Sequence, residues 1–99
     1  MLSEPLAPNE VGPVLLCGRV SEAIVAAIRQ QNAGVRLSQR GSYLRVSVSA
    51  WCEVRAEAVA TLLGEPFRIP QDLERVMPSF RGRLFLSDEL AAWEAIASP

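Results

Sequence analysis

The sequence contains no histidine, the residue that serves most often as a general base and as a metal ligand. Its two cysteines, Cys17 and Cys52, each lie inside an apolar run and are far apart along the chain. We interpret them as buried free thiols in a reducing compartment, in preference to a disulfide or a metal pair. No apolar run approaches the ~18 residues of a membrane span, and the chain does not begin like a signal peptide. We therefore expect a cytoplasmic chain that binds no metal and no membrane.

The sequence also has no marked excess of positive or negative charge. Ten basic and eleven acidic residues leave a formal net charge of -1, which gives no electrostatic reason to expect binding to nucleic acid or to an anionic membrane. Hydrophobic residues make up 49% of the 99 residues, as in a folded globular chain. Residues 1–10 contain two prolines and predict a flexible N-terminal arm. Residues 11–99 are then a single domain.

The clearest pattern that is present is a strict alternation over residues 43–54. It predicts one long, half-buried central strand. The face directed at the core would carry Leu44, Val46, Val48, Ala50, Cys52 and Val54. The opposite face carries Tyr43, Arg45 and Trp51 among polar residues. Because Tyr, Arg and Trp dominate binding hot spots, these three are candidate partner contacts. The alternative for Trp51 is that a helix of the same domain covers it.

The residues around this strand predict two halves of the β-α-β type, 11–54 and 55–99, which share one core. In the first half we expect a strand over 14–17, a helix over 21–31 with Ser21 as its N-cap, and a strand over 35–40. A hairpin turn at Arg40, Gly41 and Ser42 then leads into the central strand.

In the second half we expect a helix over 55–63 that Gly64 ends, a short helix that begins at Pro70, and a strand over 83–86. The segment 89–96 is ambiguous. Its alanines favour a helix by propensity, whereas alternating apolar residues favour a closing strand. The predicted fold class is α+β with about three helices.

The acidic residues form no catalytic or metal-binding constellation. Glu53 and Glu57 are typical of a solvated face, and the other carboxylates lack the spacing of metal ligands. Ser21 has no histidine or nearby lysine to activate it. We therefore predict no catalytic residues and no cofactor, and expect a protein that binds a partner.

Four stretches together resemble the regulatory (effector, or coupling) proteins of soluble bacterial diiron monooxygenases, and most closely the members that serve toluene monooxygenases. The matching stretches are Asn9-Glu10-Val11-Gly12-Pro13-Val14, Ser42-Tyr43-Leu44-Arg45-Val46, Leu63-Gly64-Glu65-Pro66-Phe67 and Pro78-Ser79-Phe80-Arg81-Gly82. The resemblance extends over about residues 9–95. No single stretch is diagnostic, but their order and spacing are specific.

The resemblance implies a cofactor-free, non-catalytic protein that is monomeric when free and binds the diiron hydroxylase. It would control substrate access, oxygen activation and coupling during hydroxylation of an aromatic hydrocarbon or an alkene. It also implies that residues 90–95 form a strand, and that Asn32 and Gln71 contact the hydroxylase. If so, alanine at either position should leave folding intact and alter coupling.

Two other functions are weighed against this one. The first is a small-ligand sensor with a ferredoxin-like β-α-β arrangement, which would need a polar, glycine-lined cleft between strand and helix. The second is a structural subunit of another enzyme complex. Because the net charge is near zero, the sequence predicts only a mild effect of salt on partner binding.

Overall fold

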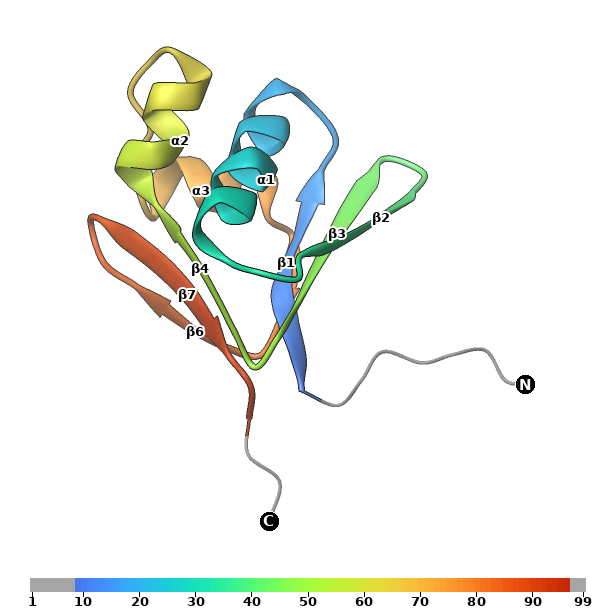
Figure 1. The fold of residues 1–99 in the computed structure, drawn as a ribbon. Coiled ribbons are helices and arrows are strands. Elements are labelled where there is room, and N and C mark those ends of the chain that lie inside the picture. Colours follow the sequence, from blue (N-terminus) through green and yellow to red (C-terminus); the bar gives the residue numbers. More distant parts are fainter. Residues whose placement is uncertain (1–8, 97–99) are drawn as a thin grey trace.

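The computed structural model describes residues 9–96, so most of the predicted arm 1–10 lies outside the described residues. Figure 1 shows the fold. The elements in chain order are β1 (Glu10–Leu16), α1 (Arg19–Gln31), β2 (Arg36–Arg40), β3 (Tyr43–Ser49), β4 (Trp51–Arg55), α2 (Ala56–Leu63), α3 (Gln71–Val76), β5 (Ser79–Arg81), β6 (Arg83–Leu86) and β7 (Leu90–Glu94). The predicted α+β class is confirmed. β1 begins at Glu10, one residue inside the predicted arm.

The strands form two antiparallel sheets. One sheet has four strands in the order β2-β3-β1-β5, and the other has three in the order β4-β7-β6. β3 and β4 diverge as the arms of a V, and α1 and α2 lie between the arms (Figure 1). Both helices pack against β4 of the three-stranded sheet, and the faces of the two sheets outside the V point away from the core.

The predicted central strand is bent at Ala50 into β3 and β4. Ala50 has a φ of 69°, in the left-handed region that a residue with a Cβ rarely adopts. Its N–H donates to the Asn9 carbonyl (2.8 Å) and its carbonyl accepts from the N–H of Ala95 (2.9 Å). These bonds hold the bend between the start of β1 and the end of β7. The side-chain alternation continues across the bend, and only Ala50 among the predicted core positions is exposed.

α1 begins two residues earlier than predicted. Gly18 is its N-cap, and the Gly18 carbonyl accepts from the N–H of Glu22 (2.9 Å). Ser21 is therefore inside the helix, where its side chain is buried and its hydroxyl lacks a hydrogen-bond partner within residues 9–96. The prediction of Ser21 as N-cap was wrong, because Gly18, at a positive φ of 154° that favours glycine, starts the helix two residues after the end of β1.

The second half follows the sequence closely except in one strand. Gly64 ends α2 in the left-handed conformation (φ 80°), and β6 has the predicted bounds. Pro70 is the N-cap of α3 and not its first helical residue. β5, which the sequence did not predict, pairs with β1.

The segment 90–94 is a strand, as the resemblance implied and helix propensity did not. β7 is the middle strand of its sheet and pairs with both β4 and β6. Trp93 lies opposite Cys52 on one side and Leu84 on the other, and its side chain is fully buried. Two sets of ladder hydrogen bonds and the burial of a large aromatic side chain outweigh the helix preference of the two alanines in this strand.

Candidate functional site

The structure places the five predicted contact residues on four parts of the fold. Tyr43 and Arg45 lie on β3 of the four-stranded sheet, and Trp51 lies on β4 of the three-stranded sheet. Asn32 is the C-cap of α1, and Gln71 is the first residue of α3. The bend at Ala50 separates Trp51 from Tyr43 and Arg45, which the sequence had placed together on one strand.

Trp51 is solvent-exposed and stacks on a second aromatic side chain, Phe85. The ring centroids are 6.4 Å apart and the planes differ by 28°. The two residues come from the outer strands of the three-stranded sheet, and Ala92 of the middle strand lies opposite Phe85. Trp51 and Phe85 remain 41% and 45% exposed, whereas Ala92 is only 1% exposed. Trp51 thus lies on an open sheet face, and the pair forms an apolar platform.

Phe85 was not predicted as a contact residue. Its strand was predicted correctly, but the antiparallel pairing that brings β6 and β4 to either side of β7 could not be read from local sequence. Trp51 also donates from its indole Nε1 to the Glu53 carboxylate (2.9 Å), which fixes the ring orientation.

The side-chain amide of Asn32 makes hydrogen bonds to the backbone of β4. The Nδ2 group donates to the carbonyls of Ile28 and Glu53, both at 2.8 Å, and Oδ1 accepts from the N–H of Glu53 at 3.1 Å. Its neighbour Gln31 accepts from the N–H of Arg55 at 2.9 Å. Because β7 pairs with only one edge of β4, these two amides satisfy backbone groups on the other edge. Asn32 therefore has a structural role that the sequence did not predict, and truncating it is expected to affect folding.

Gln71 is exposed at the start of α3. The loop before it is fixed by Asp72, whose carboxylate accepts from the N–H of Arg68 (2.8 Å) and whose N–H donates to the Arg68 carbonyl (2.8 Å). Within residues 9–96 the Gln71 side chain makes no hydrogen bond, so its amide is available to a partner.

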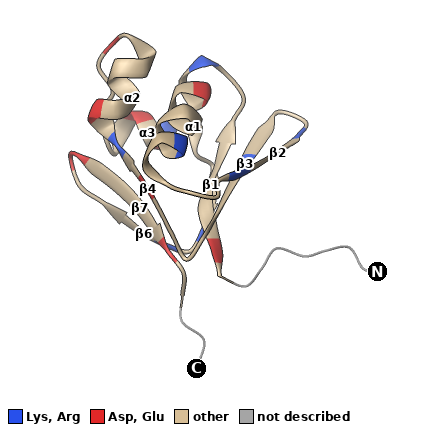
Figure 2. Ribbon diagram, viewed as in Figure 1, with Lys and Arg blue, Asp and Glu red and all other residues tan. Residues whose placement is uncertain are grey.

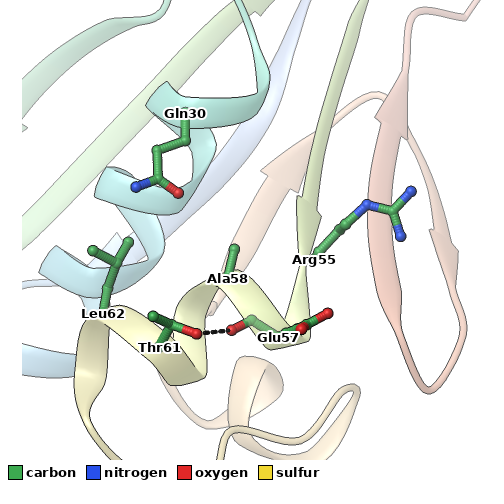
Figure 3. Close-up of a pocket in the computed structure, with 6 residues that line it drawn as sticks. All are labelled: Gln30, Arg55, Glu57, Ala58, Thr61 and Leu62. Atoms are coloured by element: carbon green, nitrogen blue, oxygen red, sulfur yellow. Dashed lines mark hydrogen bonds between the residues drawn. The ribbon is translucent and has the colours of Figure 1, made fainter.

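A shallow depression of about 280 Å³ lies between the end of α1, the end of β4 and α2 (Figure 3). Its lining residues are Gln30, Arg55, Glu57, Ala58, Thr61 and Leu62. The Thr61 hydroxyl donates to the backbone carbonyl of Glu57 (3.0 Å), so that hydroxyl is already engaged. The depression is open to solvent and lacks glycine, unlike the cleft expected of a ligand sensor.

The space between α1 and the sheets is filled by apolar side chains. Ile24 and Ile28 of α1 and Val54 of β4 are all fully buried. This packing removes the space in which the sensor hypothesis would place a ligand. Over residues 9–96, no three His, Cys, Asp or Glu side chains are grouped as metal ligands would be.

The two cysteines are free, as predicted. Cys52 is buried, and this burial, together with the nearby charge of Glu53, raises its pKa to about 12. Cys17 is exposed, so the prediction of burial was wrong for this residue. It directly follows the last residue of β1, and its N–H donates to the Ser42 carbonyl (2.8 Å), so the residue lies beyond the end of the strand and outside the core.

Within residues 9–96, every helix falls short of the length and apolar character that a membrane-spanning helix requires.

Comparison with known proteins identifies the family. The model of the MmoB/DmpM family matches residues 9–94. The chain is 32% identical over 87 residues to the effector subunit of the alkene monooxygenase system of Xanthobacter autotrophicus (strain ATCC BAA-1158 / Py2), and the match covers 86% of this chain and 85% of that protein.

Two solved chains from phenol hydroxylase–regulatory protein complexes share the fold. Their TM-scores are 0.77 and 0.74, each is 16% identical in sequence, and the matches cover 86% of this chain and 97% and 98% of theirs. At this identity the likeness supports the fold alone.

The chain therefore belongs to the MmoB/DmpM family, the effector proteins of diiron monooxygenases. It is a regulatory component and not an enzyme.

Proposed function

We propose that this chain binds the diiron hydroxylase of a multicomponent monooxygenase and controls substrate access, oxygen activation and coupling during hydroxylation. The observation that carries the proposal is the match, along most of both chains, to the effector subunit of an alkene monooxygenase system. The substrate of the complex would be an alkene or an aromatic hydrocarbon. The chain would act in the cytoplasm as a monomer when not bound to the hydroxylase.

The proposed contacts are Asn32, Gln71, Tyr43, Arg45 and Trp51. The exposure of four of them supports this role, since the side chains of Gln71, Tyr43, Arg45 and Trp51 are open to solvent. Asn32 would contribute through the loop that it anchors, because most of its amide is already used within the chain. Its remaining Oδ1 lone pair and the adjoining backbone are what a partner would meet.

A protein without catalytic activity changes the reaction of its partner enzyme only by binding one conformation of that enzyme better than another. The effector would therefore favour the hydroxylase conformation in which the diiron site reacts productively. By reciprocity, a change in the hydroxylase conformation must alter effector affinity by the same factor. A tenfold difference corresponds to about 1.4 kcal/mol of coupling free energy.

The test is a titration of the diiron hydroxylase encoded nearest to this chain in its genome. We expect turnover or coupling to rise and to saturate near one effector per active site. Binding should be measured with the iron site oxidised and reduced, because the proposal requires affinity to depend on hydroxylase conformation. A hydroxylase whose turnover, product distribution and coupling are unaffected by saturating effector would refute the proposed function.

The Gln71→Ala variant tests the contact assignment. An exposed polar side chain usually contributes about 0.5 kcal/mol or less to folding, so stability should not change. Coupling or product distribution should change if Gln71 meets the hydroxylase. Glu74→Ala, an exposed change one turn away on the same helix, is the matched control. Identical activation by wild type and Gln71→Ala would remove Gln71 from the interface.

A further inference from the structure

The outer face of the four-stranded sheet collects arginines. The chain contains no lysine, so all ten basic side chains are arginines. Four of them lie on this sheet: Arg36 and Arg40 on β2, Arg45 on β3 and Arg81 on β5. Figure 2 shows basic positions along this sheet, and acidic ones mainly on the helices and the three-stranded sheet.

The strand register places all four arginines on the same face. Arg45 lies opposite Val14 on β1 and opposite Ser38 on β2, and Ser38 is two residues from both Arg36 and Arg40. Residues two apart on a strand share a face. On the far side of β1, Gly12 lies two residues before Val14 and opposite Arg81. The arginines therefore surround the outer surface of β1 and β3.

Only one carboxylate balances these charges among the described residues of the sheet. Glu10, on β1, is nearly buried and pairs with Arg36. Arg40, Arg45 and Arg81 have no carboxylate within salt-bridge distance in residues 9–96, and all three are exposed. Four arginines against one glutamate leave this face with a net charge of +3, although the whole chain carries -1.

The same face presents apolar surface between the charges. Tyr43 is 46% exposed, and it lies opposite Leu16, which is also exposed. An exposed aromatic and aliphatic pair flanked by arginines is the composition typical of a protein interface. A nucleic acid is a poorer fit, because within residues 9–96 this face offers only three arginines without a salt bridge, and the other residues of the chain carry an excess of acidic groups.

On the basis of the proposed function, we infer that this arginine face (Arg36, Arg40, Tyr43, Arg45 and Arg81) docks on an acidic surface of the hydroxylase. Arginine suits this role, since its planar guanidinium binds carboxylates in a bidentate manner and stacks on flat groups. The near-zero net charge had predicted a mild effect of salt. The segregation of charge reverses that expectation, because a partner senses the local field of the face that it meets.

The size of the face indicates what else the contact includes. β1 and β3 have seven residues and are about 23 Å long, the other two strands are shorter, and four strands extend over roughly 15 Å, so the face measures at most roughly 350 Å². A stable interface buries about 800 Å² on each partner. The contact must therefore extend further, and we expect it to include the loop from Asn32 to β2, which leads directly into Arg36.

The experiment compares two double variants that remove the same charge. Arg45→Gln/Arg81→Gln alters the arginine face, and Arg29→Gln/Arg75→Gln removes two exposed arginines from α1 and α3. Hydroxylase binding and activation are titrated at about 0.02 M and about 0.5 M salt, where the Debye length falls from roughly 20 Å to roughly 4 Å. Thermal unfolding establishes that each variant folds, and the single Arg45→Gln variant replaces the first double if it does not.

We expect the face variant to need about tenfold more effector for half-saturation at low salt, and the two-arginine helix control to stay within about twofold of wild type. At high salt the difference should shrink to about twofold or less. Binding that is equally affected by both doubles, or by neither, would overturn the docking face and leave the proposed function standing. No binding by wild type would overturn both. Retention of a duplex DNA probe that depends on Arg45 and Arg81, without hydroxylase binding, would assign the face to nucleic acid instead.

Discussion

The side-chain amide of Asn32 binds the backbone of Glu53 as a neighbouring strand would, donating to its carbonyl and accepting from its N–H. A third bond ties the same amide to the Ile28 carbonyl at the end of α1. One side chain thus satisfies three backbone groups of two elements and fixes the end of the helix against the free edge of β4. The residue that the family resemblance assigns to the interface is also a structural anchor.

We predict that Asn32→Ala lowers the free energy of unfolding by about 2 kcal/mol, because it leaves partly buried backbone groups without their partners. Asn32→Asp should be destabilising as well, since a carboxylate oxygen would face the two carbonyls that Nδ2 now serves. Urea denaturation measures both effects. Gln71→Ala is the control and should change stability by about 0.5 kcal/mol or less. An unchanged midpoint for Asn32→Ala would contradict the anchor.

The stack of Trp51 on Phe85 should be measurable as a coupling. In a double-mutant cycle with alanine at both positions, we expect an interaction free energy of about 0.5–1.5 kcal/mol. The control cycle pairs Trp51 with Tyr43 on the other sheet, and its two effects should add to within about 0.5 kcal/mol. If the platform also contacts the hydroxylase, Phe85→Ala will weaken binding beyond its effect on folding. Additive effects of Trp51→Ala and Phe85→Ala would show that the stack contributes nothing to stability.

The bend at Ala50 predicts an unusual response to glycine. The left-handed conformation costs an alanine about 1–2 kcal/mol, and glycine adopts it freely. Against this gain, glycine raises the conformational entropy of the unfolded chain, which lowers the free energy of unfolding by about 0.4–1 kcal/mol. Ala50→Gly should therefore stabilise the protein by about 0.5 kcal/mol, and Ala50→Val should destabilise it. Ala58→Gly in α2 is the control and should cost about 1 kcal/mol. A loss of stability in Ala50→Gly would refute the strained bend.

Burial of Cys52 predicts a loss of stability at alkaline pH. Its pKa is raised from 9.0 to about 12 in the folded protein. Below pH 9 both states keep the proton, so the buried thiol contributes fully to stability. Between pH 9 and about 12 the unfolded chain loses the proton first, and the free energy of unfolding should fall by about 1.4 kcal/mol per pH unit.

The measurement compares urea denaturation across this pH range for wild type, Cys52→Ala and Cys17→Ala. Cys52→Ala should show a shallower decline than wild type. Cys17 is exposed, so Cys17→Ala should retain the wild-type slope. Equal slopes for all three proteins would mean that the Cys52 thiol does not remain protonated in the folded state.

The local elements could be predicted from sequence where a strong periodic pattern coincided with a stop signal. The alternation over 43–54 correctly separated buried from exposed side chains except at Ser47, which is buried, and Ala50, which is exposed. Gly64 marked the end of α2. These features depend on neighbours within a few residues, so propensity and periodicity suffice. The interface assignments of Asn32 and Gln71 came from the family resemblance and remain proposals.

What the sequence by itself determined is the class of fold, the apolar core and the membership in an effector family. Only the tertiary structure decided which residues from different strands lie together on one surface. The bend at Ala50 divided one predicted strand between two sheets, and β7 became a strand because it could pair on both edges. The arginine face and the Trp51–Phe85 platform each combine strands distant in sequence. Such sites arise from long-range pairing, whose register is set by burial of the whole core and not by any local run of residues.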